Sequence, residues 1–359
     1  MLQEIYQQPD VIQTCLHAYW HNQTSALLTH LPAAPPQAIQ IIASGTSRHA
    51  GLIAQVWLEQ LAGIPTRVRS GSAFLTAPLP LTPNTFTLGV TQSGETADTL
   101  QALKWERARR SRHPHDLQPY LIGITNQATS SLAKEVDVLL PTLAGVEVGV
   151  AATKTFTTQL VVLLGLALHW AKQQQVIAPD RFQQLTTALH QLPEQMRQIL
   201  QQADDIQALA APLVKAQSCI VLGSGINHAI ALEGALKLKE TTYLHAEGDA
   251  AGEFLHGPIA LLDETIPVIA IAPADTTHPA MLATMSKIKS HRSPLIGIVS
   301  TKQAAATASL CDAQIRLPVV DELLSPLLTV IPLQLLAYTI AVSRGLDVDR
   351  PRHITKTLA

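Results

Sequence analysis

Short apolar runs alternate with segments of helical period along most of the chain. The runs are AIQIIAS (38–44), TFTLGV (85–90), YLIGIT (120–125) and DVLLPT (137–142). Each has the length of a buried strand, and the segments between them have the spacing of helices. Repeated strand-then-helix units predict a parallel sheet covered by helices, which is an α/β fold.

The same series of motifs occurs twice. IIASGTSRHAG (41–51) resembles CIVLGSGINHA (219–229), LIGITN (121–126) resembles LIGIVS (295–300), and LLPT (139–142) resembles RLPV (316–319). The offsets are 178, 174 and 177 residues, so one nearly constant shift aligns all three pairs. Unrelated matches have no reason to share a shift, which indicates a duplicated α/β domain.

The regions outside the two copies differ in composition. A Gln-rich segment separates the copies, and its residues Phe182, Leu185, Leu189 and Leu192 have the spacing of an amphipathic helix. A Pro-rich stretch, LPAAPPQ, precedes the first strand. We therefore expect a helical N-terminal arm (1–36), a first domain (37–172), a linking helix (173–207), a second domain (208–346) and an irregular tail (347–359).

Composition narrows the possible functions. The 359 residues are 47% hydrophobic and 14% charged, with a net charge of −2, so the chain can bury a large core but attracts neither nucleic acid nor anionic membrane. The longest apolar run, 160–170, is too short to span a bilayer. Three distant cysteines without CxxC spacing and no visible secretory signal predict a cytoplasmic protein with reduced thiols.

Three polar turns follow strands of the first domain: SGTS (44–47), TQSGET (91–96) and GVEVGVAATKT (145–155). In a parallel sheet such turns meet at one edge, where helix N-termini bind anions. One alternative is that Ser93 or Thr91 caps a helix and Glu95 complements its dipole. Capping requires one hydroxyl, however, whereas these turns contain Thr46, Ser47, Thr91, Ser93 and Thr96. A phosphate site without lysine is the sharper prediction, and the second copy has APADTT (272–277) at the equivalent place.

A different cluster occupies the second domain. Glu233, Lys237 and Glu240 fall at i, i+4 and i+7 of a mostly apolar segment, so they share one stripe of a helix. On an exposed face they would form weak ion pairs. On a buried helix, a glutamate next to lysine is a candidate base. His256, in the loop LHGP, is placed to meet solvent or ligand, while Lys356 in the tail has the ordinary reading of a solvated charge.

Two other motifs are weak. LGSGINH contains GxG after a strand, but His228 replaces the third glycine of a dinucleotide fingerprint. His245, Glu247 and His256 match no common metal-ligand spacing. We therefore expect neither a cofactor nor a metal.

Several long motifs of the chain resemble those of the sugar isomerase (SIS) domain family, and most closely the isomerase half of glutamine:fructose-6-phosphate amidotransferases. They are EIYQQP, SGTSRHAG, TQSGETADTL, GVAATKTFTTQL, EGALKLKE, HAEGDAAGEFLHGP and the C-terminal LDVDRPRHITK, in the family's order. The resemblance implies two tandem SIS subdomains, each a parallel five-stranded sheet flanked by helices in a flavodoxin-like or Rossmann-like arrangement.

The resemblance also implies roles for individual residues. The sugar-phosphate cradle corresponds to Ser47, Thr91, Gln92, Ser93 and Thr96, with Val150 near the sugar. Glu240 matches the base that moves a proton between C1 and C2, and Lys237 lies one helical turn earlier. His256 matches a histidine that assists ring opening from the neighbouring subunit, which implies a homodimer. Lys356 matches the lysine that forms an imine with the keto sugar.

This chain departs from the family at several positions. The usual Cys, Ser and Ser become Ser44, Thr91 and Ala152, and the residue before the lysine is Thr355. Ala152 has no hydroxyl, so one sugar contact is lost. The family's glutaminase nucleophile is a cysteine after Met1, whereas here Leu2 follows Met1. We therefore expect ammonia, rather than glutamine, to be the nitrogen source within this polypeptide.

The sequence thus predicts an enzyme that interconverts glucosamine 6-phosphate with fructose 6-phosphate and ammonia, as a deaminase or ammonia-dependent isomerase. The alternatives are an isomerase or deglycase of another keto or amino sugar phosphate, and an isomerase subunit that uses a separate glutaminase. A non-catalytic sugar-phosphate sensor is a fourth, although a sensor would not need Lys356.

Overall fold

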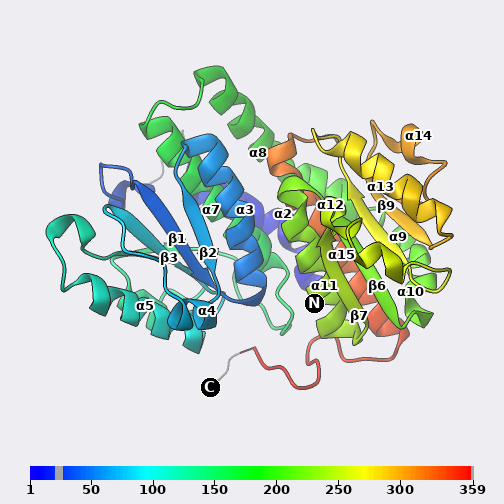
Figure 1. Cartoon of the computed structure of the whole chain (residues 1–359), viewed down its shortest axis with the longest axis horizontal. Coiled ribbons are helices and arrows are strands. Elements are labelled where there is room, and N and C mark those ends of the chain that lie inside the picture. The colour runs from blue at the N-terminus through cyan, green and yellow to red at the C-terminus, as the bar shows by residue number, and fades with distance from the viewer. Residues whose placement is uncertain (21–26, 357–359) are drawn as a thin grey trace. The chain divides into compact units, whose positions relative to one another are not determined.

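A computed structural model describes residues 1–20 and 27–356, and over these residues the chain forms two parallel sheets of five strands each (Figure 1). The first sheet has the order β2-β1-β3-β4-β5 and the second the order β10-β9-β8-β6-β7. Counted along the chain, both sheets have the same topology. The predicted fold class of two similar α/β subdomains is therefore confirmed.

The strands of the first sheet are β1 (Ala38–Ala43), β2 (Thr66–Arg69), β3 (Thr85–Val90), β4 (Tyr120–Thr125) and β5 (Val138–Pro141). Those of the second are β6 (Ser218–Gly223), β7 (His245–Ala250), β8 (Val268–Ala272), β9 (Leu295–Ser300) and β10 (Ala313–Leu317). The four apolar runs named in the sequence are β1, β3, β4 and β5. The sequence did not identify β2 and β7, which are edge strands with charged residues at alternate positions.

Helices flank both sheets. The first sheet is accompanied by α3 (Gly45–Ala62), α4 (Gly71–Thr76), α5 (Ala97–Arg110), α6 (Ser131–Glu135) and α7 (Lys154–Gln173). The second is accompanied by α11 (His228–Thr242), α12 (Ala251–Phe254), α13 (His278–Ser290), α14 (Ala304–Thr307) and α15 (Ser325–Ser343). The remaining helices are α1 (Leu2–Tyr6), α2 (Gln8–Trp20), α8 (Pro179–Leu200), α9 (Ala203–Leu209) and α10 (Ala211–Lys215).

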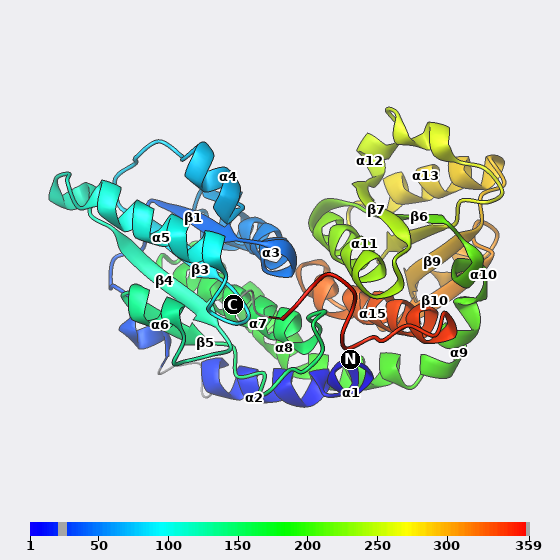
Figure 2. The same ribbon diagram turned by 90° about the horizontal axis from the view of Figure 1, so that it is seen from below.

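Consecutive residues of each central strand face opposite helical layers. In β1, Ile42 packs in a cluster with Phe74 of α4 and Leu103 of α5. Helices α4 and α5 themselves lie side by side in Figure 1. Its neighbour Ile41 contacts α3, where a Cβ built on Gly51 would lie 3.0 Å from the isoleucine side chain. The second sheet likewise has α12 and α13 on one side and α11 and α15 on the other (Figure 2). Strands buried on both faces explain why the apolar runs are continuous rather than alternating.

The chain contacts divide into two compact units. Of the described residues, the β1–β5 unit contains 10–20, 27–147, 154–190, 355 and 356. The β6–β10 unit contains residues 1–9, 148–153 and 191–354. Helix α8 belongs partly to each unit, and its Phe182, Leu185, Leu189 and Leu192 are buried, as the amphipathic spacing predicts. The domain boundaries expected from the sequence stay a prediction.

Helix α15 and the residues before it form the most apolar helical segment of the β6–β10 unit. Glu322–Ser343 is long and apolar enough to cross a membrane by length and composition, yet 94% of its most apolar window is buried inside the protein. Burial of this kind is expected of a core helix that packs against a sheet and other helices. Its apolar character is thus accounted for by packing within the unit.

The three cysteines are free and buried. Burial raises the pKa of Cys311 to about 11 and that of Cys219 to about 12, and it raises the pKa of Cys15 as well. Because a thiolate is the reactive form of cysteine, these side chains are inert core residues.

One buried charge cluster fixes α5 to β1. The Glu106 carboxylate, which is fully buried, accepts hydrogen bonds from Gln40 of β1 and from Arg109 and Arg110 of its own helix. Arg110 is itself 1% exposed and also donates to the carbonyls of Thr82 and Leu117. The cluster therefore ties α5, whose N-terminus follows the TQSGET turn, to a central strand.

We expect Glu106→Ala to lower the free energy of unfolding by about 3–5 kcal/mol, because it leaves the buried Arg110 without its carboxylate. Denaturant unfolding of the purified protein measures this change. Arg107→Ala is the matched control: the partly exposed Arg107 pairs with Asp137 at 3.1 Å, and its loss should cost at most about 1 kcal/mol. Equal effects of the two substitutions would contradict the role given to Glu106.

Candidate functional site

The turn between β1 and α3 places two hydroxyls at the carboxyl edge of the first sheet. Gly45 has a φ of +53°, which allows the chain to turn directly from the strand into the helix. Thr46 and Ser47 follow in the first helical turn, and Ser47 is buried. The Gln159 amide of α7 donates to Ser47 Oγ at 3.0 Å, so this hydroxyl has a fixed position.

The turn between β3 and α5 lies beside the first one, because β1 and β3 are adjacent parallel strands. Helix α5 starts after Thr96, which makes no side-chain capping bond. The hydroxyls of Thr91 and Thr96 are instead hydrogen-bonded to each other at 2.6 Å, and Ser93 Oγ accepts the Glu95 N–H at 3.1 Å. The alternative that Ser93 or Thr91 caps α5 is therefore wrong.

The backbone of this second turn is held by its neighbours. Gly94 has a φ of +71°, and a Cβ on it would lie 2.0 Å from Ser130 Oγ, so only glycine fits. The carbonyl of Gln92 accepts the hydroxyl of Thr125, the last residue of β4, and the backbone N–H of Asn126, both at 3.1 Å. The geometry presented by Thr91, Ser93 and Thr96 is thus a property of the folded sheet edge.

The acidic residues of the turn do not oppose an anion site. Glu95 Oε1 accepts the Ser131 N–H at 2.7 Å, at the start of α6 rather than α5, and this bond lowers the pKa of Glu95. Asp98 lies in the first turn of α5 and is exposed. Glu95 therefore has a structural partner of its own.

The equivalent edge of the second sheet differs. A pocket of about 10 Å³ lies there, lined by residues that include Pro273 and Ala274 after β8, Ser300 at the end of β9, and Thr329. A space of that size holds about one water molecule. Most of the residues that line this pocket are apolar, unlike the hydroxyl-rich TQSGET turn of the first sheet.

Helix α11 carries the acid–base cluster. Lys237 is 1% exposed, and its Nζ lies 3.4 Å from Glu233 Oε1 and 2.6 Å from Glu240 Oε2. Glu233 is fully buried, whereas the Glu240 side chain is 23% exposed. The weak surface ion pairs considered for this stripe are therefore excluded by its burial. The lysine contacts both carboxylates, and of the two only Glu240 keeps access to solvent.

His256 lies in a turn between α12 and the short helix Pro258–Leu261. The backbone N–H of His256 donates to the backbone carbonyl of Glu253 at 2.9 Å, and the residue is exposed. His245 and Glu247, considered above as metal ligands, are exposed residues of the edge strand β7. The structure thus leaves the His256 imidazole available to solvent or to another molecule.

The segment 147–153 carries Val150 and Ala152, which are both half-buried. The Glu4 carboxylate of α1 accepts the N–H groups of Val148 and Gly149, the latter at 3.1 Å. A Cβ on Gly149 would lie 2.9 Å from Glu4, so glycine permits this close approach. The Val150 N–H donates to the Asp349 carbonyl of the tail at 3.1 Å.

Lys356 is not a fully solvated charge. Its Nζ lies 2.8 Å from Oε2 of Glu147, a carboxylate whose side chain is fully buried, and the lysine side chain itself is 20% exposed. Thr355, directly before it, is exposed.

Within each unit the structure brings part of the predicted set together. In the β1–β5 unit, the five cradle residues and Thr46 occupy neighbouring turns: Thr46, Ser47, Thr91, Gln92, Ser93 and Thr96. Thr355 and Lys356 belong to the same unit. In the β6–β10 unit Lys237 and Glu240 are in contact, while His256 lies on one other segment and Val150 and Ala152 share another.

Sequence reasoning did not single out the buried carboxylates Glu4 and Glu147, and it named Glu233 only as part of the helical stripe with Lys237 and Glu240. Glu147 lies in the polar turn 145–155, and Glu233 on the stripe of Lys237, so both were within patterns already noted. No sequence signal links Glu147 with a lysine 209 residues away.

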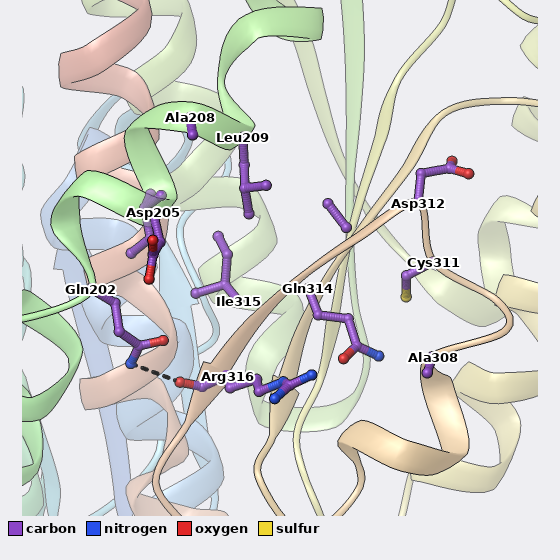
Figure 3. A pocket seen from close by; sticks show the side chains of 12 residues that line it. Gln202, Asp205, Ala208, Leu209, Ala308, Cys311, Asp312, Gln314, Ile315 and Arg316 are labelled. Carbon is purple, nitrogen blue, oxygen red and sulfur yellow. Dashed lines mark hydrogen bonds between the residues drawn. The ribbon is translucent and has the colours of Figure 1, made fainter.

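A pocket of about 590 Å³ lies elsewhere, between α9 and the edge strand β10 (Figure 3). Its lining includes Gln202, Asp205, Cys311 and Gln314, and the Gln202 amide donates to the Arg316 carbonyl at 3.0 Å. None of the predicted site residues lines it. Its volume alone assigns it no role.

The fold and the turns described above match a known family. The SIS domain model matches residues 34–169 and 212–344. The chain belongs to the SIS domain family.

Individual relatives narrow the comparison. Two glutamine–fructose-6-phosphate aminotransferases (isomerizing), of Synechocystis sp. and Thermosynechococcus vestitus, are 48% and 49% identical to it over 370 and 368 residues. These alignments cover 100% of this chain but 58% and 59% of the relatives, so the chain spans somewhat more than half of their length.

Solved structures agree. The C-terminal domain of the glucosamine-fructose-6-phosphate aminotransferase of Francisella tularensis has a TM-score of 0.88 and 31% identity, with 98% of each chain covered. A glucosamine-6-phosphate deaminase of Thermotoga maritima has a TM-score of 0.78 over 99% of this chain and 98% of its own. At 22% identity that second likeness supports the fold alone.

The lowered pKa of Glu95 predicts a pH-dependent contribution to stability. A carboxyl whose pKa is lower in the folded state stabilises the protein above its ordinary value of 4.5, and loses that effect as pH falls through the folded-state pKa. We expect the stability difference between the wild type and Glu95→Gln to shrink as pH falls below 4.5. Urea unfolding at neutral and acidic pH measures it, and Asp98→Asn, on the same turn, serves as the exposed control. A difference that grows in acid would contradict the Ser131 contact.

Proposed function

We propose that the chain is a phosphosugar isomerase that interconverts fructose 6-phosphate and ammonia with glucosamine 6-phosphate and water. The observation that carries the proposal is the contact of Glu240 with the buried Lys237 on α11. A carboxylate that is anchored by a buried ammonium and still reached by solvent is a suitable general base. Isomerisation of this kind moves a proton between C1 and C2, and no electrons leave the sugar.

The first sheet supports the substrate class. Five hydroxyls in two adjacent turns, at the start of α3 and of α5, can donate to the oxygens of a phosphate: Thr46, Ser47, Thr91, Ser93 and Thr96. The positive ends of the two helix dipoles favour an anion at the same place. A sugar phosphate would bind there without a lysine.

Lys356 is proposed to form the covalent intermediate. Its neutral amine attacks the C2 carbonyl of the open-chain ketose, and the carbonyl oxygen leaves as water to give an imine. Ammonia adds to this imine and expels the lysine amine, which leaves the ammonia-derived imine at C2. That imine makes the C1 hydrogens more acidic, so that Glu240 can carry a proton from C1 to C2 to give the amino sugar, and the same steps run backwards in deamination.

His256 is proposed to assist ring opening. Its exposed turn supports the idea that the imidazole serves a site on a neighbouring copy of the chain, which requires a homodimer. Ala152, which lacks the hydroxyl common in the family, favours a second candidate: isomerisation of another keto or amino sugar phosphate. In either case the proposal is for a cytoplasmic enzyme.

We expect Glu240→Gln to lower kcat by about 10²–10⁴-fold, the usual contribution of a general base, while the KM for the sugar phosphate changes little. Coupled assays of fructose 6-phosphate and glucosamine 6-phosphate turnover give both constants. Glu247→Gln is the control, because Glu247 is an exposed carboxylate of the neighbouring strand β7. Loss of activity in both variants alike would contradict the assignment of the base.

Borohydride reduction in the presence of fructose 6-phosphate should trap a sugar adduct on Lys356, detected by peptide mass, and Lys356→Arg should abolish it. A protein that binds the sugar phosphate but is never trapped, and releases no isomer, would be a sensor instead.

A panel of keto and amino sugar phosphates, with ammonia, with glutamine, or with glutamine and a separate glutaminase, identifies the substrate and the nitrogen source. Turnover with ammonia alone is expected. Activity with glutamine but not with ammonia would overturn the proposed nitrogen source.

A further inference from the structure

The Glu147 carboxylate is buried directly before α7. Its side chain is fully buried, although the neighbouring Val146 and Val148 are exposed by 79% and 69%. The Thr155 N–H donates to Oε1 at 3.1 Å, and the Thr155 hydroxyl donates to Oε2 at 2.7 Å. Because Thr155 lies in the first turn of α7, the carboxylate also faces the positive end of a 20-residue helix. Its position is therefore set by one of the most buried elements of the β1–β5 unit.

Lys356 lies on a segment with no regular structure of its own. Between the end of α15 at Ser343 and residue 356, the described chain contains neither helix nor strand. A long lysine side chain on an irregular segment has many conformations, and holding one of them requires a fixed partner. Glu147 Oε2, 2.8 Å from Nζ, is such a partner.

We propose that Glu147 is the positioning residue for Lys356, an inference that rests on the proposed imine role of this lysine. The carboxylate, anchored on α7, holds the lysine nitrogen at one place and orients it for attack on the sugar carbonyl. An oriented nucleophile reacts faster than a mobile one, and a misplacement of about 1 Å costs on the order of 10²-fold in rate.

The same contact suits the product of that attack. Over the whole step, the Lys356 ammonium and the C2 carbonyl give a protonated imine and water: one proton leaves the nitrogen so that the neutral amine can attack, a second leaves after the attack, both end on the departing water, and the third stays on nitrogen. The nitrogen carries a positive charge and an N–H at both ends of the step. Glu147 Oε2 can therefore accept a charge-assisted hydrogen bond from it before and after the C–N bond forms.

The test compares wild type, Glu147→Gln and Glu147→Asp. Gln keeps an oxygen that can accept the Thr155 N–H but removes the negative charge. Asp keeps the negative charge, but its side chain is one methylene shorter, so the carboxylate lies farther from Lys356. We expect Glu147→Gln to lower both kcat and the rate of borohydride trapping by fructose 6-phosphate about 10- to 100-fold, the usual effect of losing a hydrogen bond to a charged group. Glu147→Asp should recover part of the loss.

Inorganic phosphate, tested as a competitive inhibitor, reports on the cradle separately. Its inhibition constant should stay within about two-fold in both variants, since a positioning role acts through Lys356 and not through phosphate binding.

Three outcomes decide the matter. Trapping and kcat that are unchanged in Glu147→Gln overturn the inference. A parallel loss of phosphate affinity, with a lowered unfolding midpoint in both variants, also overturns it, because Glu147 would then be merely structural. If borohydride traps no adduct on Lys356 in the wild type, the proposed imine chemistry itself is refuted. This outcome needs only the wild-type measurement, so it is distinct from the outcomes for the Glu147 variants.

Discussion

The parallel pairing of β1 with β3 is the constraint on which the candidate phosphate site depends. Since both strands run in the same direction, their carboxyl ends and the helices that follow begin at one edge. Neighbouring side chains hold the two turns between strand and helix in place. The Gln159 amide donates to Ser47 Oγ, and the Ser130 side chain packs closely on Gly94. An array of hydroxyls held in this way loses little freedom when it binds an anion.

Comparing the two copies of the α/β subdomain shows which features the fold needs and which belong to a site. Both sheets have the same strand order, and both turn from the first strand into a helix through a glycine with a φ of +53°, Gly45 and Gly225. Hydroxyl-rich TQSGET in one copy corresponds to APADTT in the other, without a change of fold. The second copy instead carries buried charge on α11. The turn residues and the first helix therefore diverged while the sheet was retained.

The strand pattern and the duplication were predictable from the sequence because buried parallel strands are continuous apolar runs. The polar edge strands β2 and β7 were not, since TRVR and HAEGDA lack such a run and are defined by pairing with one neighbour. In the candidate site, the contact of Lys237 with Glu240 was predictable from the sequence, because residues three positions apart on one helix lie on the same face. The contact of Glu147 with Lys356 is tertiary, and the bond of Glu95 to Ser131 rather than to its own helix depends on where α6 begins.

The division of the chain into units has a consequence for the order of folding. The Gln8 amide donates to Gln334 Oε1 at 2.8 Å inside the β6–β10 unit, across 326 residues of sequence. During synthesis, the first nine residues have no such partner until α15 has left the ribosome, whereas the strands of the first sheet are complete at Pro141. Contacts of such long range form slowly, because a large loop must close before they stabilise anything. The Gln8–Gln334 contact therefore requires nearly the whole chain, whereas the contacts of Glu4 with Val148 and Gly149 require only its first 149 residues.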